Sequence, residues 1–394
     1  MGRELIWRKF NKGYYEVIPH TDDQPVCRLL RNRMISVIGA GPVGSTAAKY
    51  CSKRYDVVLF ESQVVSERRV QCAGLVSRSG LERIGIRVSS SSSKSFLQNG
   101  VRGARIFSPS GNLLEVDGGK NKAFVIDRKE FDNYLLNMAI DSGVEFINER
   151  VNGKNIDEII KKSEKLIIAT GTNYELHKIL NLKIPNRFLM GAQYEMKINC
   201  DREFVELYFN VPEFFSWIIP VDDHARIGLC TRKNPIRYLN SFIKKLEGDG
   251  RISNKKILNR NFGIIPIYDP KIRTQYGKIA VVGDAASQVK ASTGGGIVMG
   301  CTAAKFASEE DYEKKWRSEI GRELYLHLLI RRFLNRLSDK NLDGLFILLN
   351  ENKEIIEKEG DMDIASKLFL ALVKNPRFMA KFLFHTPGYI YDMF

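Results

Sequence analysis

The sequence predicts an α/β fold, with a parallel sheet, an antiparallel sheet inserted into it, and a helical C-terminal region. Three observations predict it. Residues 34–62 read as strand, glycine turn, helix and strand; residues 187–232 are β-forming residues in period two; and residues 310–394 are charged and leucine-rich at helical period. With 394 residues the chain exceeds one typical core, so we expect two or three structural units.

The first convincing element begins at Met34. Residues 1–33 are polar and basic without clear periodicity, and we interpret them as a flexible arm or as an upstream reading of the true start. From Met34, "MISVIGAGPVGSTAAKYCSKRYDVVLFES" is an apolar strand, a glycine turn, a small-residue helix and a second strand that ends in an acid. This order of elements indicates one βαβ unit.

The turn of that unit carries a G-x-G-x-x-G motif, formed by Gly39, Gly41 and Gly44. The first glycine permits the tight turn, the second lets a pyrophosphate approach the backbone, and the third lets helix and strand pack closely. Glu61 ends the second strand, where a carboxylate can accept both ribose hydroxyls. The strand, the helix and the acid follow one another at the expected spacing, which favours a Rossmann-type dinucleotide site over a tight turn without a ligand. The motif is common to NAD and FAD sites.

The next elements alternate in type. The serine run of residues 88–95 indicates a loop, and residues 101–117, around the turn "SPSGN", indicate a hairpin. Apolar residues at helical spacing predict a helix over residues 127–143. Residues 144–148 and 165–171 are strand-like.

A second glycine site lies far downstream, in "GDAASQVKASTGGGIVMG". Asp284 follows a buried strand, at the carboxyl end where ligands bind in open α/β sheets. An acid there can hold ribitol hydroxyls, and Gly294, Gly295 and Gly296 can bring bare amides to a flavin and its pyrophosphate. NAD needs no such second site, so the pattern favours FAD over an ordinary strand, turn and helix.

Together these motifs resemble a known family. "VIGAGPVGSTAA", "QCAGLVS", "VIDRKEFD", "IIATG", "FSWIIP" and "VVGDAASQVKASTGGGI" occur in the order expected for the archaeal geranylgeranyl reductase family, within the flavoproteins shaped like p-hydroxybenzoate hydroxylase. The resemblance covers about residues 34–350. It implies FAD as cofactor and a reaction in which reduced FAD saturates isoprenoid double bonds of archaeal membrane lipids or their precursors.

The resemblance also implies residue roles. Arg128 is expected near the FAD pyrophosphate, and Cys72 beside the flavin, where a thiol is either a proton donor or a packing element. A surface arginine and simple thiol burial are the plain alternatives. The shared motifs add three further cofactor contacts, at Ala73, Gly171 and Ile297.

An apolar wall is predicted at "FSWIIP". Phe215, Trp217 and Ile219 alternate, so one face of the strand presents all three, and such a wall suits an isoprenoid chain that offers almost nothing to hydrogen-bond. Ordinary sheet core is the alternative for these residues.

The chain departs from the family pattern beside the glycine loop. Where the family has an Asp-Pro pair, this sequence has Lys290 and Ala291. Loss of the proline would loosen the loop, and a reversed charge next to the flavin would alter its redox potential or the substrate.

We therefore expect an FAD-dependent reductase acting on the C=C bonds of geranylgeranyl chains. A flavin-dependent monooxygenase on an apolar substrate uses the same scaffold and is the first alternative. A non-catalytic, flavin-containing membrane-associated protein is the second. No histidine or carboxylate stands out in the sequence as the proton donor. The resemblance implies Cys72 as the candidate catalytic residue.

The net charge and the cysteine pattern indicate which partners and which location to expect for the protein. The net charge of +15 suits a ferredoxin as electron donor, with NAD(P)H docking as the other option, and suits peripheral contact with an anionic membrane. No nucleic-acid motif is present, and six cysteines without a C-x-x-C pair argue against a metal site. Without an apolar leader or an uninterrupted apolar span, a cytoplasmic location is expected.

These assignments divide the chain into four parts. We expect an N-terminal extension (1–33), a discontinuous FAD-binding domain (34–88, 118–180 and 265–310), a substrate-binding β-sheet domain (89–117 and 181–264) and a helical C-terminal region (311–394).

Overall fold

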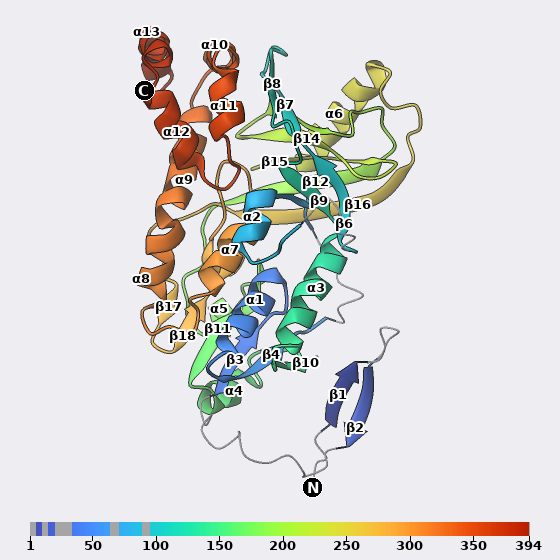
Figure 1. Cartoon of the computed structure of the whole chain (residues 1–394), viewed down its shortest axis with the longest axis vertical. Helices are drawn as coiled ribbons and strands as arrows, with labels where there is room; N and C mark the ends of the chain where they lie inside the picture. Colours follow the sequence, from blue (N-terminus) through green and yellow to red (C-terminus); the bar gives the residue numbers. More distant parts are fainter. Residues whose placement is uncertain (1–4, 10–14, 20–33, 64–70, 89–94, 394) are drawn as a thin grey trace.

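The computed structural model describes residues 5–9, 15–19, 34–63, 71–88 and 95–393. Its lower part in Figure 1 is a six-stranded sheet. All neighbouring strands in this sheet are parallel except the last pair. In sheet order the strands are β10 (Glu145–Ile147), β4 (Asp56–Phe60), β3 (Met34–Ile38), β11 (Lys165–Ile168), β18 (Ile279–Val281) and β17 (Gln275–Tyr276).

Helices bury both faces of this sheet. One face packs against α1 (Pro42–Cys51), which contacts α3 (Arg128–Ile140) and α7 (Ile297–Ala304). The other face packs against α4 (Ile156–Lys162) and α5 (Glu175–Ile179). Because both faces are covered, the strands are continuously apolar rather than alternating, as parallel sheets require. The predicted βαβ unit of β3, α1 and β4 is confirmed.

The second large sheet has seven strands and lies above the first in Figure 1. Its neighbours are antiparallel except β13 and β7, which run parallel. One face packs on α6 (Pro235–Gly248), and the other shares a core with the parallel sheet. In sheet order the strands are β16 (Ile257–Pro266), β12 (Phe188–Met196), β15 (Ala225–Thr231), β14 (Phe214–Pro220), β13 (Phe204–Val211), β7 (Gly103–Phe107) and β8 (Leu113–Asp117).

Most sequence-based elements are confirmed, with local differences. The hairpin is β7 and β8, which begins at Gly103, because Val101 belongs to a third sheet. That sheet contains β5 (Leu75–Ser77), β9 (Ala123–Ile126) and β6 (Leu97–Val101), and α2 (Arg78–Arg83) follows β5. The serine loop lies largely outside the described residues.

The N-terminal segment differs from its interpretation as an arm without periodic structure. It contains β1 (Leu5–Lys9) and β2 (Tyr15–Pro19), which pair antiparallel.

The C-terminal region is helical, as predicted. Its helices are α8 (Tyr312–Trp316), a π-helical turn (Arg317–Gly321), α9 (Arg322–Leu334), α10 (Asp339–Asn350), α11 (Lys353–Glu359), α12 (Ala365–Lys374) and α13 (Pro376–Met393). They line one side of the molecule, coloured orange to red in Figure 1. Within the described residues, no helix combines the length and the hydropathy needed to span a bilayer.

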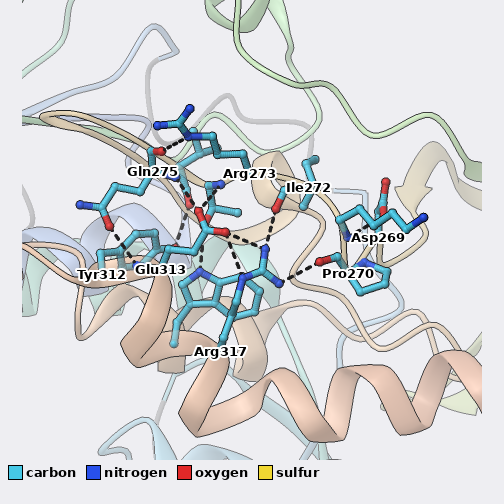
Figure 2. A network of polar contacts seen from close by, with 12 residues as sticks. Asp269, Pro270, Ile272, Arg273, Gln275, Tyr312, Glu313 and Arg317 are labelled. Carbon is cyan, nitrogen blue, oxygen red and sulfur yellow. Dashed lines mark hydrogen bonds and ion pairs between the residues drawn. The ribbon is translucent and has the colours of Figure 1, made fainter.

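A polar network, drawn in Figure 2, attaches the start of this region to the segment that leads into β17 and β18. The Glu313 carboxylate accepts backbone hydrogen bonds from Thr274 and Gln275, at 2.8 and 3.1 Å. The Arg317 guanidinium donates to the carbonyls of Pro270 and Ile272 and also binds Glu313. These contacts hold the strand that precedes the second glycine site against the C-terminal helices.

Candidate functional site

The three glycines of the first motif lie at the carboxyl end of β3 and have different surroundings. A Cβ on Gly39 would lie 2.5 Å from the carbonyl oxygen of Ala169, and Gly39 has φ of +99°. A Cβ on Gly44 would lie 1.7 Å from the carbonyl oxygen of Gly39. A Cβ on Gly41 would meet nothing within 4 Å. The first and third glycines therefore close the turn, and the second leaves space at the N-terminus of α1.

Glu61 lies at the same edge of the sheet. Its Oε2 accepts a hydrogen bond from the Ala40 backbone N–H at 2.9 Å, inside the glycine turn. Gly171, with φ of +59°, follows the neighbouring strand β11 at its carboxyl end. The acid, the glycine turn and Gly171 are thus gathered on one edge, where open α/β sheets bind ligands.

Arg128 and Cys72 meet near Asp284. Arg128 begins α3 and binds Asp132 through two hydrogen bonds, of 3.0 and 3.2 Å. Burial alone would lower the pKa of Arg128, but Asp132 and the hydrogen-bonded Cys72 thiol raise it. Cys72 also accepts from the Gly74 N–H, at 3.3 Å. The Arg128 side chain is 16% exposed and is held against α3 by Asp132.

Asp284 links this cluster to the second glycine site. It lies just after β18, and a Cβ on Gly296 would be 2.4 Å from its Oδ1. Burial raises the pKa of Asp284, an effect that the Arg128 charge partly offsets. Gly294 adopts φ of +72°, and α7 begins at Ile297 with Gly296 as its N-cap. The loop places a carboxylate, a helix N-terminus and bare backbone within one small region.

The predicted wall lies on the face of the antiparallel sheet that packs toward the parallel sheet. Trp217 and Ile219 belong to the shared core, and Phe215 packs against it. The Trp217 Nε1 donates to Gln193 Oε1 at 3.0 Å, and Gln193 Nε2 donates to the Cys72 carbonyl at 3.4 Å. Strand β14 is therefore joined through Gln193 to the loop that carries Cys72 and Ala73.

Sequence reasoning missed Arg226, which supports the same loop. Its side chain is almost fully buried and donates to the carbonyls of Ala73 and Ile126, at 2.8 and 3.2 Å, and to Gln98 Oε1 at 2.6 Å. Glu195 Oε1 lies 3.4 Å from its Nε. The sequence did contain a signal for Arg226, because an arginine at an inward position of a largely apolar strand indicates a buried polar contact.

Curated relatives extend over most of the chain. A digeranylgeranylglycerophospholipid reductase from Methanocaldococcus jannaschii is 29% identical over 374 residues, covering 82% of this chain and 92% of the relative. A protein of the same name from Methanosarcina acetivorans is 29% identical over 392 residues, covering 86% and 93%. Over most of its length the chain is therefore similar to digeranylgeranylglycerophospholipid reductases, at 28–29% identity. No protein-family model matches the sequence.

Solved structures share this fold. A geranylgeranyl bacteriochlorophyll reductase-like protein from Thermoplasma acidophilum superposes with a TM-score of 0.71 at 20% identity, covering 90% of this chain and 99% of that protein. A myxobacterial chondrochloren halogenase, one of the FAD-dependent halogenases, gives 0.56 at 15% identity, covering 75% and 82%. The chain therefore has the α/β fold of FAD-dependent oxidoreductases.

The departure from the family pattern is compensated inside this chain. Lys290 is 4% exposed, and its Nζ donates to Asp363 Oδ1 and to the Met362 carbonyl. Asp363 also accepts from the Ser77 hydroxyl. Asp363, from the segment before α12, therefore neutralises the lysine. Nothing in the sequence indicated this pairing across the C-terminal helices.

A buried histidine lies beside this ion pair and predicts acid sensitivity. His327 is 3% exposed, and its Nδ1 lies 2.5 Å from Ser292 Oγ. Burial and the Lys290 charge lower its pKa from 6.5 to about 4. Between these two values the unfolded chain binds the extra proton, so stability falls as the pH is lowered through this window. We expect the titration of His327 to lower the free energy of unfolding by about 3 kcal/mol between pH 6.5 and pH 4.

Urea unfolding at several pH values measures this dependence. His327→Gln should flatten the slope in that window. His177, whose pKa burial also lowers, and carboxylates with a lowered pKa such as Asp363 should supply the slope that remains. An unchanged slope in His327→Gln would show that His327 already carries its proton in the folded protein.

Proposed function

We propose that this protein binds FAD and uses it to saturate C=C bonds of geranylgeranyl chains in membrane lipids or their precursors. The observation that carries the proposal is that Arg128 contacts Cys72 and its charge acts on Asp284, whose carboxylate lies against the Gly296 backbone of the second glycine site. Similarity to digeranylgeranylglycerophospholipid reductases supports the same assignment.

The residues present fit an FAD cofactor. The open space at Gly41 would accept a pyrophosphate against the N-terminus of α1, and Arg128 would supply a cation to it. Glu61 would exchange its contact with Ala40 for ribose hydroxyls, and Asp284 would accept ribitol hydroxyls. Gly171, Ala73 and Ile297 would complete the lining.

When bound, FAD would supply the hydride equivalent for the reduction. An isolated alkene is a poor hydride acceptor, so the protein must orient the chain and deliver a proton to the second carbon. Cys72 is the candidate donor, because its thiol faces the cluster and Arg128 and the Gly74 N–H both contact it.

The substrate side of the site is apolar. Phe215, Trp217 and Ile219 would contact the isoprenoid chain, and the hydrogen bond from Trp217 to Gln193 keeps the only polar atom of that wall satisfied. A wall without unsatisfied polar groups excludes water and suits a ligand that is recognised by shape.

Either ferredoxin or NAD(P)H would reduce the enzyme. If an acidic ferredoxin is the donor, opposite charges steer the encounter toward this protein of net charge +15. We then expect the rate of flavin reduction to fall about tenfold between low and physiological salt, because exposed charges are screened. Stopped-flow reduction measures this rate. A rate that is independent of salt with ferredoxin, together with rapid reduction by NADPH, would assign the donor role to the nicotinamide.

The function is tested on purified protein loaded with FAD. The flavin is reduced anaerobically with dithionite, digeranylgeranyl lipid is added in detergent, and flavin reoxidation and product mass are followed together. We expect reoxidation with a mass gain of two hydrogens for each saturated bond. Reduced flavin that ignores the lipid but reacts with oxygen and inserts an oxygen atom would replace the proposal by a monooxygenase. Flavin that resists every donor would indicate a non-catalytic flavoprotein.

A further inference from the structure

The last helix of the chain has apolar side chains on both its buried and its exposed side. Phe378, Phe382 and Tyr389 of α13 pack inward, toward α10 and α12. On the exposed side, Leu383, Phe384, Ile390 and Tyr391 have relative exposures of 59%, 81%, 47% and 85%. We name these four residues the apolar C-terminal face. A helix that is apolar all round is normally buried on every side, so this face requires a further apolar surface.

Exposed apolar side chains also occur on the neighbouring helices α12 and α10. On α12, Phe369, Leu370 and Val373 are also exposed, although Leu372 of that helix is buried. A groove of about 470 Å³ separates α10 from α13, and Ile347 on its α10 side is half exposed. Exposed large apolar residues therefore gather on the C-terminal helices.

The charges around the face are mostly positive. Residues 365–393 contain four basic residues, Lys367, Lys374, Arg377 and Lys381, and a single acidic residue, Asp392. Asp392 is turned toward α10, where its carboxylate accepts hydrogen bonds from Ser338 and Asn341. Lys381 pairs with Glu351 at 2.6 Å, whereas the other three cations form no ion pair within the described part of the chain.

The acidic residues just upstream do not cancel this charge at the surface. Asp343 binds Ser108 and Ser110, and Glu357 accepts from the Asp117 N–H, so both carboxylates are used against the antiparallel sheet. Asp363 is buried against Lys290. These three acids hold the C-terminal helices to the body of the protein. Glu354 and Glu359 of α11 are matched in number by Lys353 and Lys358 of the same helix, and the cations of α12 and α13 remain at the outer surface.

We propose that the apolar C-terminal face is a docking surface for an anionic lipid bilayer, with α13 lying in the plane of the headgroups. Exposed Leu, Phe, Ile and Tyr with flanking Lys and Arg are the composition of interfacial helices, in which apolar burial and attraction to anionic lipids add. A second copy of this chain fits less well, because a two-fold axis would bring the same basic residues of two copies together. The lipid substrate of the proposed function, on which this inference rests, would then be drawn from the membrane that α13 touches.

Vesicle binding tests this surface directly. The full-length FAD-loaded protein is mixed with phosphatidylcholine vesicles that contain or lack phosphatidylglycerol, and the bound fraction is measured by flotation. We expect binding to the anionic vesicles, with Leu383→Ser/Tyr391→Ser reducing the partition coefficient about tenfold or more through lost apolar burial. Arg377→Glu/Lys381→Glu should remove the preference for phosphatidylglycerol.

Matched controls separate docking from misfolding. Ile236→Ser and Leu258→Ser change aliphatic residues that are 47% and 44% exposed on α6 and β16, and both variants should bind vesicles as the wild type does. Absence of wild-type binding to anionic vesicles, or an equal loss in the control variants, would overturn the proposal. A dimer in light scattering that Leu383→Ser/Tyr391→Ser converts to a monomer would assign the face to a second copy instead.

Turnover of detergent-dispersed lipid distinguishes this inference from the proposed function. Leu383→Ser/Tyr391→Ser should reduce micellar digeranylgeranyl lipid at the wild-type rate and vesicle-embedded lipid about tenfold more slowly. If neither protein reduces the micellar lipid, the proposed function fails, whereas the vesicle-binding result still decides whether the face docks on a bilayer.

Discussion

Replacing Gly41 with alanine will weaken FAD binding about a hundredfold while leaving the apoprotein folded. The α-carbon of Gly41 faces open space, and its φ of −70° and ψ of −177° are accessible to alanine, so the added methyl group meets no protein atom. The cost to the apoprotein is the weaker N-cap, about 1 kcal/mol. The methyl group instead occupies the space where a pyrophosphate would approach the N-terminus of α1. The hundredfold weaker binding corresponds to a loss of about 2.7 kcal/mol of binding free energy.

Gly44→Ala is the matched comparison. Its Cβ would lie 1.7 Å from a backbone oxygen that cannot move independently, so α1 must shift and we expect the apoprotein to lose about 3 kcal/mol of stability together with FAD affinity. Flavin fluorescence titration measures affinity, and urea unfolding of the apoprotein measures stability. Tight FAD binding in Gly41→Ala would show that the cofactor does not use this turn.

The sequence was informative where function requires a local pattern. The turn between β3 and α1 needs glycines at fixed offsets and an acid after the next strand, and all of these are contiguous in the chain. The same holds for the hairpin of β7 and β8, whose turn residues lie between two alternating segments. Period two in residues 187–232 predicted the antiparallel sheet for the same reason.

Contacts between distant segments were not predictable. Ser77 and Asp363 are 286 residues apart, and neither lies in a motif. The position of β6 depends on pairing with β9, which no local signal identifies. The predicted hairpin therefore included Val101, which belongs to β6. Buried polar residues such as Arg226 and Gln193 are determined by which loop packs against the sheet, and a single sequence records only that a polar residue interrupts an apolar strand.

Neutralising Lys290 alone will destabilise the protein by about 3–5 kcal/mol, the range measured when one partner of a buried ion pair is removed. In Lys290→Met, the Asp363 carboxylate stays buried and keeps the hydrogen bond that it accepts from the Ser77 hydroxyl. The pKa of Asp363, which the Lys290 charge now holds below its usual value against the effect of burial, should rise. Urea unfolding gives the free-energy change. Lys315→Met, which removes an exposed lysine with two ion pairs, is the control and should cost less than about 1 kcal/mol.

The double variant Lys290→Met/Asp363→Asn separates charge burial from packing. With both charges gone, we expect it to be about 2 kcal/mol more stable than Lys290→Met, because no uncompensated charge remains. FAD affinity should follow the same order, since the Lys290 stem lies under the glycine loop: a Cβ on Gly295 would be 2.7 Å from Lys290 Cε. If affinity is equal in all three proteins, the backbone hydrogen bonds between Lys290 and residues 294 and 295 hold the loop unaided, and the buried ion pair only fastens the C-terminal helices to the domain.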